Sequence, residues 1–185
     1  DMNEGLISQR YAKALYEYAV QLNEEEALYN RLQILSKELQ TIPQMKDILY
    51  NPMISFDDKT LLLNEATGKS PEQSYLSFVN LILENRREKS ILQIALSYQS
   101  LYRKKKNIRV VSLISAEELQ PEFLSRICKD VTDQTHGTVE FSNHIDQSLE
   151  GGFIFQLNDL RLDASVKNQL ERIRRQFLQK NKTIV

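Results

Sequence analysis

Apolar side chains recur every three or four positions through roughly the first 106 residues, which is the spacing of helix faces packed on a core. Proline and glycine separate the helices: Asn51-Pro52 disfavours helical geometry, Gly68 ends one helix, and Ser70-Pro71 precedes the next. The pattern predicts six consecutive helices. Their clearest face is a leucine seam in the second helix, formed by Leu28, Leu32, Leu35 and Leu39.

The pattern changes after the basic run from Arg103 to Lys106. The segment from Ile108 to Ser115 is rich in β-branched residues and reads as a strand, and a helix is expected to begin at Pro121. Alternating apolar residues predict further strands around Phe141 and after Gly151-Gly152, and an amphipathic segment predicts a last helix. The fold class is therefore α+β, with an N-terminal six-helix bundle (1–106) and a small C-terminal α/β domain (107–185).

The first, fifth and sixth helices carry apolar arcs that are wider than a single core contact needs, and a central position in the bundle accounts for the sixth. Beyond its main seam, the first helix adds Ala12, Tyr16 and Ala19, so its arc spans about 200° at ~100° per residue. The fifth helix is similar and has Phe78 and Leu81 on one flank. Such a helix either lies at the centre of the bundle or lines a groove for a helix of another protein. The pattern alone leaves both possibilities open.

Composition and charge exclude several functions. The formal net charge is −1, which argues against a general nucleic-acid binder. One cysteine permits no internal disulfide and fits a reducing compartment. No apolar run approaches the ~20 residues needed to cross a bilayer. We therefore expect no direct membrane insertion, so that any membrane association runs through a partner.

The sequence signals for catalytic, metal or phosphate sites are weak. Gly68-Lys69-Ser70 lacks the earlier glycine of a phosphate-binding loop. His136 and His144 have no metal-ligand spacing, and Cys128 falls on the inner face of its helix. Asp159 and Asp163 suit a turn and a helix cap better than an acid–base pair. We expect no catalytic residue, no metal or cofactor site and no bound nucleotide. The basic run before residue 107 suits a solvated helix end, or else an acidic partner or lipid surface.

Four segments, in order along the chain, resemble the ATP synthase delta subunits, the family of the mitochondrial oligomycin-sensitivity-conferring protein. They are Arg10-Tyr11-Ala12-Lys13-Ala14-Leu15; Asn51-Pro52 with Lys59; Leu81 to Arg86; and a C-terminal stretch containing Asp146, Leu149, Gly151, Gly152, Phe153, Asp159, Asp163, Ser165, Val166 and Leu170. Ala164 stands where the family usually has glycine, and Gln147 where it commonly has proline.

The resemblance implies a non-catalytic stator subunit of a rotary, proton-translocating ATP synthase. An N-terminal helix of an alpha subunit should bind between the first and fifth helices, on Ala12, Tyr16, Ala19, Phe78 and Leu81. The small domain should bind the b subunits of the peripheral stalk, in a complex on the cytoplasmic face of a bacterial inner membrane. The alternatives are a generic helical cytoplasmic adaptor and an enzyme that uses Asp159 and Asp163 on phosphorylated substrates.

Overall fold

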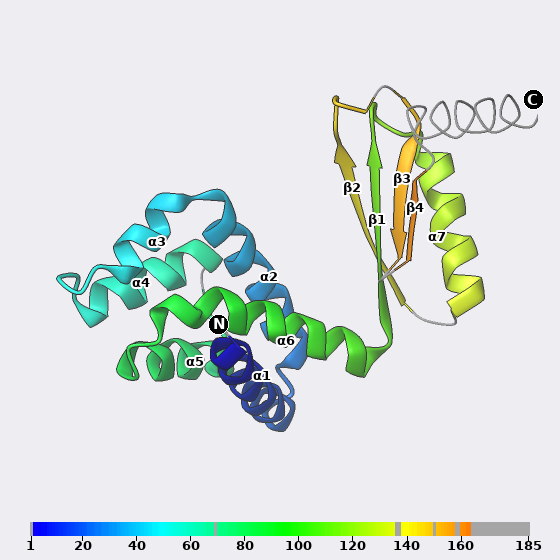
Figure 1. The fold of residues 1–185 in the computed structure, drawn as a ribbon. Coiled ribbons are helices and arrows are strands. Elements are labelled where there is room, and N and C mark those ends of the chain that lie inside the picture. The colour runs from blue at the N-terminus through cyan, green and yellow to red at the C-terminus, as the bar shows by residue number, and fades with distance from the viewer. Residues whose placement is uncertain (1, 69, 136–137, 150, 158–159, 164–185) are drawn as a thin grey trace, which may run out of the picture. The chain divides into compact units, whose positions relative to one another are not determined.

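The computed structural model describes residues 2–68, 70–135, 138–149, 151–157 and 160–163 (Figure 1). The chain divides into two compact units, residues 1–105 and the part from Lys106 onward. The first unit consists of helices and the second contains a β-sheet, so the predicted α+β fold class is confirmed.

The first unit contains the six predicted helices. They are α1 (Met2–Leu22), α2 (Glu25–Thr41), α3 (Pro43–Tyr50), α4 (Phe56–Thr67), α5 (Gln73–Glu84) and α6 (Ile91–Lys106), with a short 3-10 turn, η1 (Glu88–Ser90), before α6. Local chemistry fixes several ends. The Ser55 side chain accepts a hydrogen bond from the backbone N–H of Asp58 at the start of α4. Gly68, with φ of +97°, ends α4 in a conformation that glycine adopts without strain.

Helix α6 runs along the bundle, with α3 and α4 on one side and α1 and α5 on the other (Figure 1). The predicted leucine seam of α2 is fully buried. Two side chains of α6 satisfy backbone groups of α2: Tyr98 donates to the carbonyl of Glu25, and Gln99 donates to the carbonyl of Leu32. These bonds help to fix how α6 lies on α2, because shifting the helix would leave buried polar groups without partners.

The second unit has a four-stranded sheet in the order β2-β1-β3-β4. Its elements are β1 (Ile108–Ser115), α7 (Pro121–Thr135), β2 (Thr138–Ile145), β3 (Phe153–Leu157) and β4 (Leu160–Asp163). Strands β1 and β2 are parallel and joined through α7, whereas β3 pairs antiparallel with β1 and β4. Helix α7 lies against the sheet (Figure 1). Val111 and Leu113 of the central strand are fully buried.

A buried ion pair ties α4 to η1 in the first unit. The Lys59 ammonium donates to a carboxylate oxygen of Glu88 at 2.8 Å, and both side chains are largely shielded from solvent. Removing one partner of a buried pair leaves the other charge without compensation, which costs more than removing both.

We therefore expect Glu88→Leu to lower the free energy of unfolding by about 2–3 kcal/mol, because it leaves the Lys59 ammonium buried and unpaired. The double variant Lys59→Met/Glu88→Leu should recover most of that loss, because no charge remains to be desolvated. Urea unfolding followed by circular dichroism measures both values. A double variant less stable than Glu88→Leu alone would contradict this role for the pair.

Candidate helix-docking site

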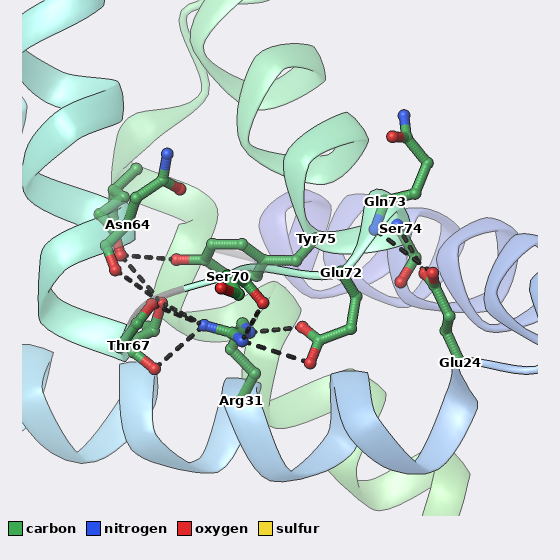
Figure 2. A network of polar contacts seen from close by, with 11 residues as sticks. Glu24, Arg31, Asn64, Thr67, Ser70, Glu72, Gln73, Ser74 and Tyr75 are labelled. Atoms are coloured by element: carbon green, nitrogen blue, oxygen red, sulfur yellow. Dashed lines mark hydrogen bonds and ion pairs between the residues drawn. The ribbon is translucent and has the colours of Figure 1, made fainter.

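The turn between α4 and α5 is held by one buried side chain of α2, Arg31 (Figure 2). Its guanidinium donates to the carbonyls of Thr67 and Gly68, both at 3.0 Å, and to that of Ser70 at 3.2 Å. It also forms a forked ion pair with Glu72. The rigid fork of an arginine suits this set of acceptors better than the point charge of a lysine. Arg31 thereby fixes the end of α4 and the start of α5 on α2.

Tyr75 adds a second tie between α4 and α5. Its hydroxyl donates to the carbonyl of Leu63 at 2.8 Å, and its ring lies 5.4 Å from the Arg31 guanidinium carbon. Burial raises the pKa of Tyr75 to about 12, so its hydroxyl remains a donor at neutral pH. The turn offers carbonyl oxygens to a cation, whereas a phosphate-binding loop offers N–H groups. The weak phosphate motif at Gly68 is therefore a helix end.

The start of α5 is capped by a residue from outside the helix. Ser70-Pro71 precedes this helix, as the sequence predicts, and α5 begins at Gln73. The carboxylate of Glu24, which follows α1, accepts from the backbone N–H of Ser74 at 2.8 Å and of Gln73 at 3.4 Å. Hydrogen bonding from Ser74 lowers the pKa of Glu24. A carboxylate at a helix N-terminus also meets the positive end of the helix dipole.

The contact with Glu24 places the C-terminal end of α1 beside the N-terminal end of α5. The Tyr18 hydroxyl lies 3.5 Å from that of Ser77, one turn into α5. At ~100° per residue, Ile7, Tyr11, Tyr18 and Leu22 fall within about 60° of one another on α1. We call this flank, together with Ser77 and Leu81 of α5, the α1–α5 face.

The α1–α5 face exposes apolar surface to solvent. Tyr18 is 36% exposed, Leu22 37% and Leu81 47%, while Ile7 and Tyr11 are half-buried. Exposed apolar side chains that share one flank of two adjacent helices are typical of a surface that receives a third helix. This face is the strongest candidate for a binding site within the described part of the first unit.

The structure corrects the role of several predicted partner-binding residues. Ala12, Ala19 and Phe78 are at most 3% exposed, because they pack inside the chain's own bundle. Tyr16 is half-buried and turns toward α6, where its ring lies 5.9 Å from that of Tyr98. These four residues support the face from within or from the opposite flank. Of the predicted set, Leu81 alone is exposed on the face itself.

Tyr18 and Leu22 are exposed although both follow the helical spacing of apolar residues that predicts an inward-facing seam. The small side chains of Ala12 and Ala19 signalled the true inward direction, since alanine permits close approach between helices. Seen along the helix axis, the buried line runs through Ser8, Ala12, Leu15 and Ala19. The tyrosines and Leu22 flank that line.

The C-terminal motif residues lie at the edge of the sheet. Gly151 and Gly152, with φ of +126° and +79°, turn the chain into β3, and Phe153 pairs with Ser115 of β1. Asp163 pairs with Ile154 at the end of β4. A cavity of about 600 Å³ lies beside this turn and is lined by Glu117, Glu118, Leu149 and Phe153, among others. Ser165 and Val166 lie outside the described residues, as does the predicted last helix.

The remaining candidate chemical residues form no recognisable site in the described ranges. His144 is exposed on β2, and the side chain of Cys128 in α7 is outside what the structure describes, as are His136, Lys69 and Asp159. Among the residues with described positions, no group of three His, Cys, Asp or Glu is arranged to hold a metal ion. None of the described helices has both the length and the hydropathy of a membrane span.

A helical bundle with a partly exposed apolar helix face, followed by a small α/β unit, has the features of a protein that binds other chains. Comparison with known proteins identifies the assembly. Residues 7–177 match the family described as ATP synthase delta (OSCP) subunit. The chain therefore belongs to this family, a structural subunit of ATP synthase.

Relatives match the chain over nearly its whole length. The ATP synthase subunit delta of Phocaeicola vulgatus is 44% identical over 182 residues, which are 98% of each protein. That of Bacteroides thetaiotaomicron is 42% identical and covers all of both chains. A chain of the Toxoplasma gondii mitochondrial ATP synthase hexamer has the same fold, with a TM-score of 0.71 over 92% of this chain and 20% identity.

Family membership places the protein among the stator and peripheral-stalk components of ATP synthase. Its partners are other subunits of that complex, which is a peripheral membrane assembly. The generic-adaptor alternative does not account for a family match that extends through the second unit.

The cap formed by Glu24 predicts a pH-dependent contribution to stability. The pKa of Glu24 is lower in the folded state than in the unfolded chain. The cap therefore contributes its full stabilisation at pH values above the ordinary pKa of glutamate. This contribution is lost as the pH falls through the folded-state pKa. Glu24→Ala should therefore lower the free energy of unfolding by about 1 kcal/mol at pH 7. The difference from wild type should shrink toward pH 3.

Urea unfolding at both pH values measures this difference. Glu17→Ala, an exposed position in the middle of α1, is the matched control and should show no such pH-dependent gap. A gap for Glu24→Ala that stayed constant with pH would show that the carboxylate charge is not involved.

Proposed function

We propose that this chain is a non-catalytic connector whose α1–α5 face binds the N-terminal helix of an ATP synthase alpha subunit. The observation that carries the proposal is the exposure of Tyr18, Leu22 and Leu81 on adjacent helices that Glu24 and Arg31 hold in place. An amphipathic helix laid along this face would cover all three side chains with its own apolar stripe.

The physical character of the face suits a long-lived contact. Covering exposed apolar area contributes ~25 cal/mol per Å², and a few central aromatic or leucine side chains usually dominate such interfaces. The face is also preorganised, because the buried Arg31 network and the Glu24 cap are internal to the bundle. Little ordering entropy is then lost by this chain when a partner helix binds.

In this proposal the second unit binds the b subunits of the peripheral stalk, with the last segment of the chain contributing. Proton flow turns the rotor inside the alpha–beta head, and the head must be held still for torque to drive ATP synthesis. Two attachments on one chain add avidity, because release of one leaves the other in place. The complex lies on the cytoplasmic face of a bacterial inner membrane. The connection requires no nucleophile, metal or nucleotide from this chain.

The proposal predicts specific losses of peptide affinity. In a calorimetric titration with a synthetic peptide of the alpha-subunit N-terminus from the same source, Tyr18→Glu or Leu81→Glu should weaken binding at least about tenfold. The reason is that each substitution places a desolvated carboxylate within the apolar contact.

Leu61→Glu is the matched control, because Leu61 is a 60% exposed leucine on α4, away from the face. It should bind the peptide like wild type. Ala12→Glu is not a useful variant, because Ala12 is buried and a charge there would destabilise the bundle itself. Unchanged affinity of Tyr18→Glu and Leu81→Glu, with circular dichroism matching wild type, would refute the assignment of this face.

A further inference from the structure

Helix α1 borders a second groove on its opposite flank, where it meets α6. The groove has a volume of about 410 Å³ and is lined by Gln9, Ala12, Lys13, Ser97, Ser100, Leu101 and Lys104. Ala12 is buried beneath the groove and Ser97 and Leu101 are half-buried, whereas Gln9 and Ser100 are exposed and can form hydrogen bonds. It lies on the Tyr16 flank of α1, opposite the flank that carries Tyr18.

The charge of this groove is one-sided. Lys13 comes from α1 and Lys104 from α6, so the two ammonium groups stand on different walls, and no acidic side chain lines the groove. In the part of the chain that the structure describes, neither lysine forms an ion pair. By contrast, Lys59 and Arg31 in the same bundle are both paired with carboxylates.

A helix-end effect does not account for this arrangement. Lys104 lies in the last turn of α6, where a cation is favoured by the helix dipole without any partner. Lys13 lies in the middle of α1, where no such effect operates, and yet it faces the same groove. Two unpaired lysines on facing walls above a small-residue floor therefore indicate complementarity to a negatively charged ligand.

We propose that the α1–α6 groove is a second docking surface, which binds an acidic helix of another subunit of the same assembly. Ser97 and Ser100 are small and accessible, and they allow a helix backbone to approach closely. Carboxylates on the two flanks of that helix would then meet Lys13 on one wall and Lys104 on the other. The occupant is thus an amphipathic helix whose small apolar residues lie between acidic ones, in contrast to the apolar stripe that fits the α1–α5 face.

The test uses the full chain and ATP synthase from its own source from which this subunit has been removed. Rebinding of the labelled chain is titrated at low salt and at about 0.5 M salt, where the Debye length falls to a few ångströms. Lys13→Glu/Lys104→Glu should weaken rebinding at least tenfold at low salt, and the difference from wild type should shrink at high salt. Lys37→Glu, an exposed lysine of α2, is the control and should rebind like wild type.

A carbodiimide, which joins an amine to a carboxylate only when the two are in contact, gives the direct readout. Mass spectrometry of the reconstituted complex should show Lys13 or Lys104 joined to an Asp or Glu of another subunit. Unchanged rebinding of the double variant would overturn the proposal, as would the absence of any such cross-link. Loss of binding to anionic phospholipid vesicles with intact rebinding would overturn it in favour of a lipid contact.

These outcomes are separable from those of the α1–α5 face. Leu81→Glu acts through apolar contact, so its loss of affinity should persist at high salt, whereas the loss caused by the lysine substitutions should not. The experiments can therefore refute the assignment of one docking surface without affecting the assignment of the other.

Discussion

Helices α4 and α5 leave carbonyl oxygens at the turn between them, and the side chain of Arg31 from α2 satisfies three of these carbonyls together with the carboxylate of Glu72. A buried guanidinium needs acceptors, and the carbonyl oxygens of this turn together with the Glu72 carboxylate supply them. These hydrogen bonds from Arg31 hold the start of α5 in position on α2. Because α1 lies on α5, the relative placement of the two helices that form the docking face follows as well.

Much of the fold could be predicted because its signals are local. The leucine seam of α2, the Ser55 cap, the glycine at the end of α4 and the β-branched strand after Asn107 each depend on residues a few positions apart. The start of α5 could not be predicted in the same way. Its cap comes from Glu24, about 50 residues earlier in the chain, and only the folded bundle brings this carboxylate to the helix end.

The residues of the candidate site could not be predicted from local sequence for the same reason. A helical wheel shows that α1 has apolar residues over a wide arc, but not which flank its neighbours cover. That depends on where α5 and α6 lie, and their positions are set by contacts such as Arg31 with Thr67 and Gln99 with Leu32. The pair of helices selected from the sequence also forms the α1–α5 face that we propose as a docking site, but three of the five selected side chains are in the core: Ala12, Ala19 and Phe78. The sequence pattern alone did not distinguish the small side chains of Ala12 and Ala19, which pack inward, from Tyr18, which is exposed.

The two docking surfaces that we propose lie on opposite flanks of α1 and differ in physical character. The flank toward α5 carries tyrosine and leucine, whose contribution depends on apolar area and changes little with ionic strength. The flank toward α6 carries Lys13 opposite Lys104, whose contribution depends on charge and acts over longer range. Apolar contact gives a slow dissociation rate, while paired charges select orientation and register. A subunit that must resist torque benefits from both kinds of contact. A single bound helix resists being pulled away from α1 better than it resists rotation of α1 about the axis of α1. Contacts on opposite flanks of α1 would oppose that rotation.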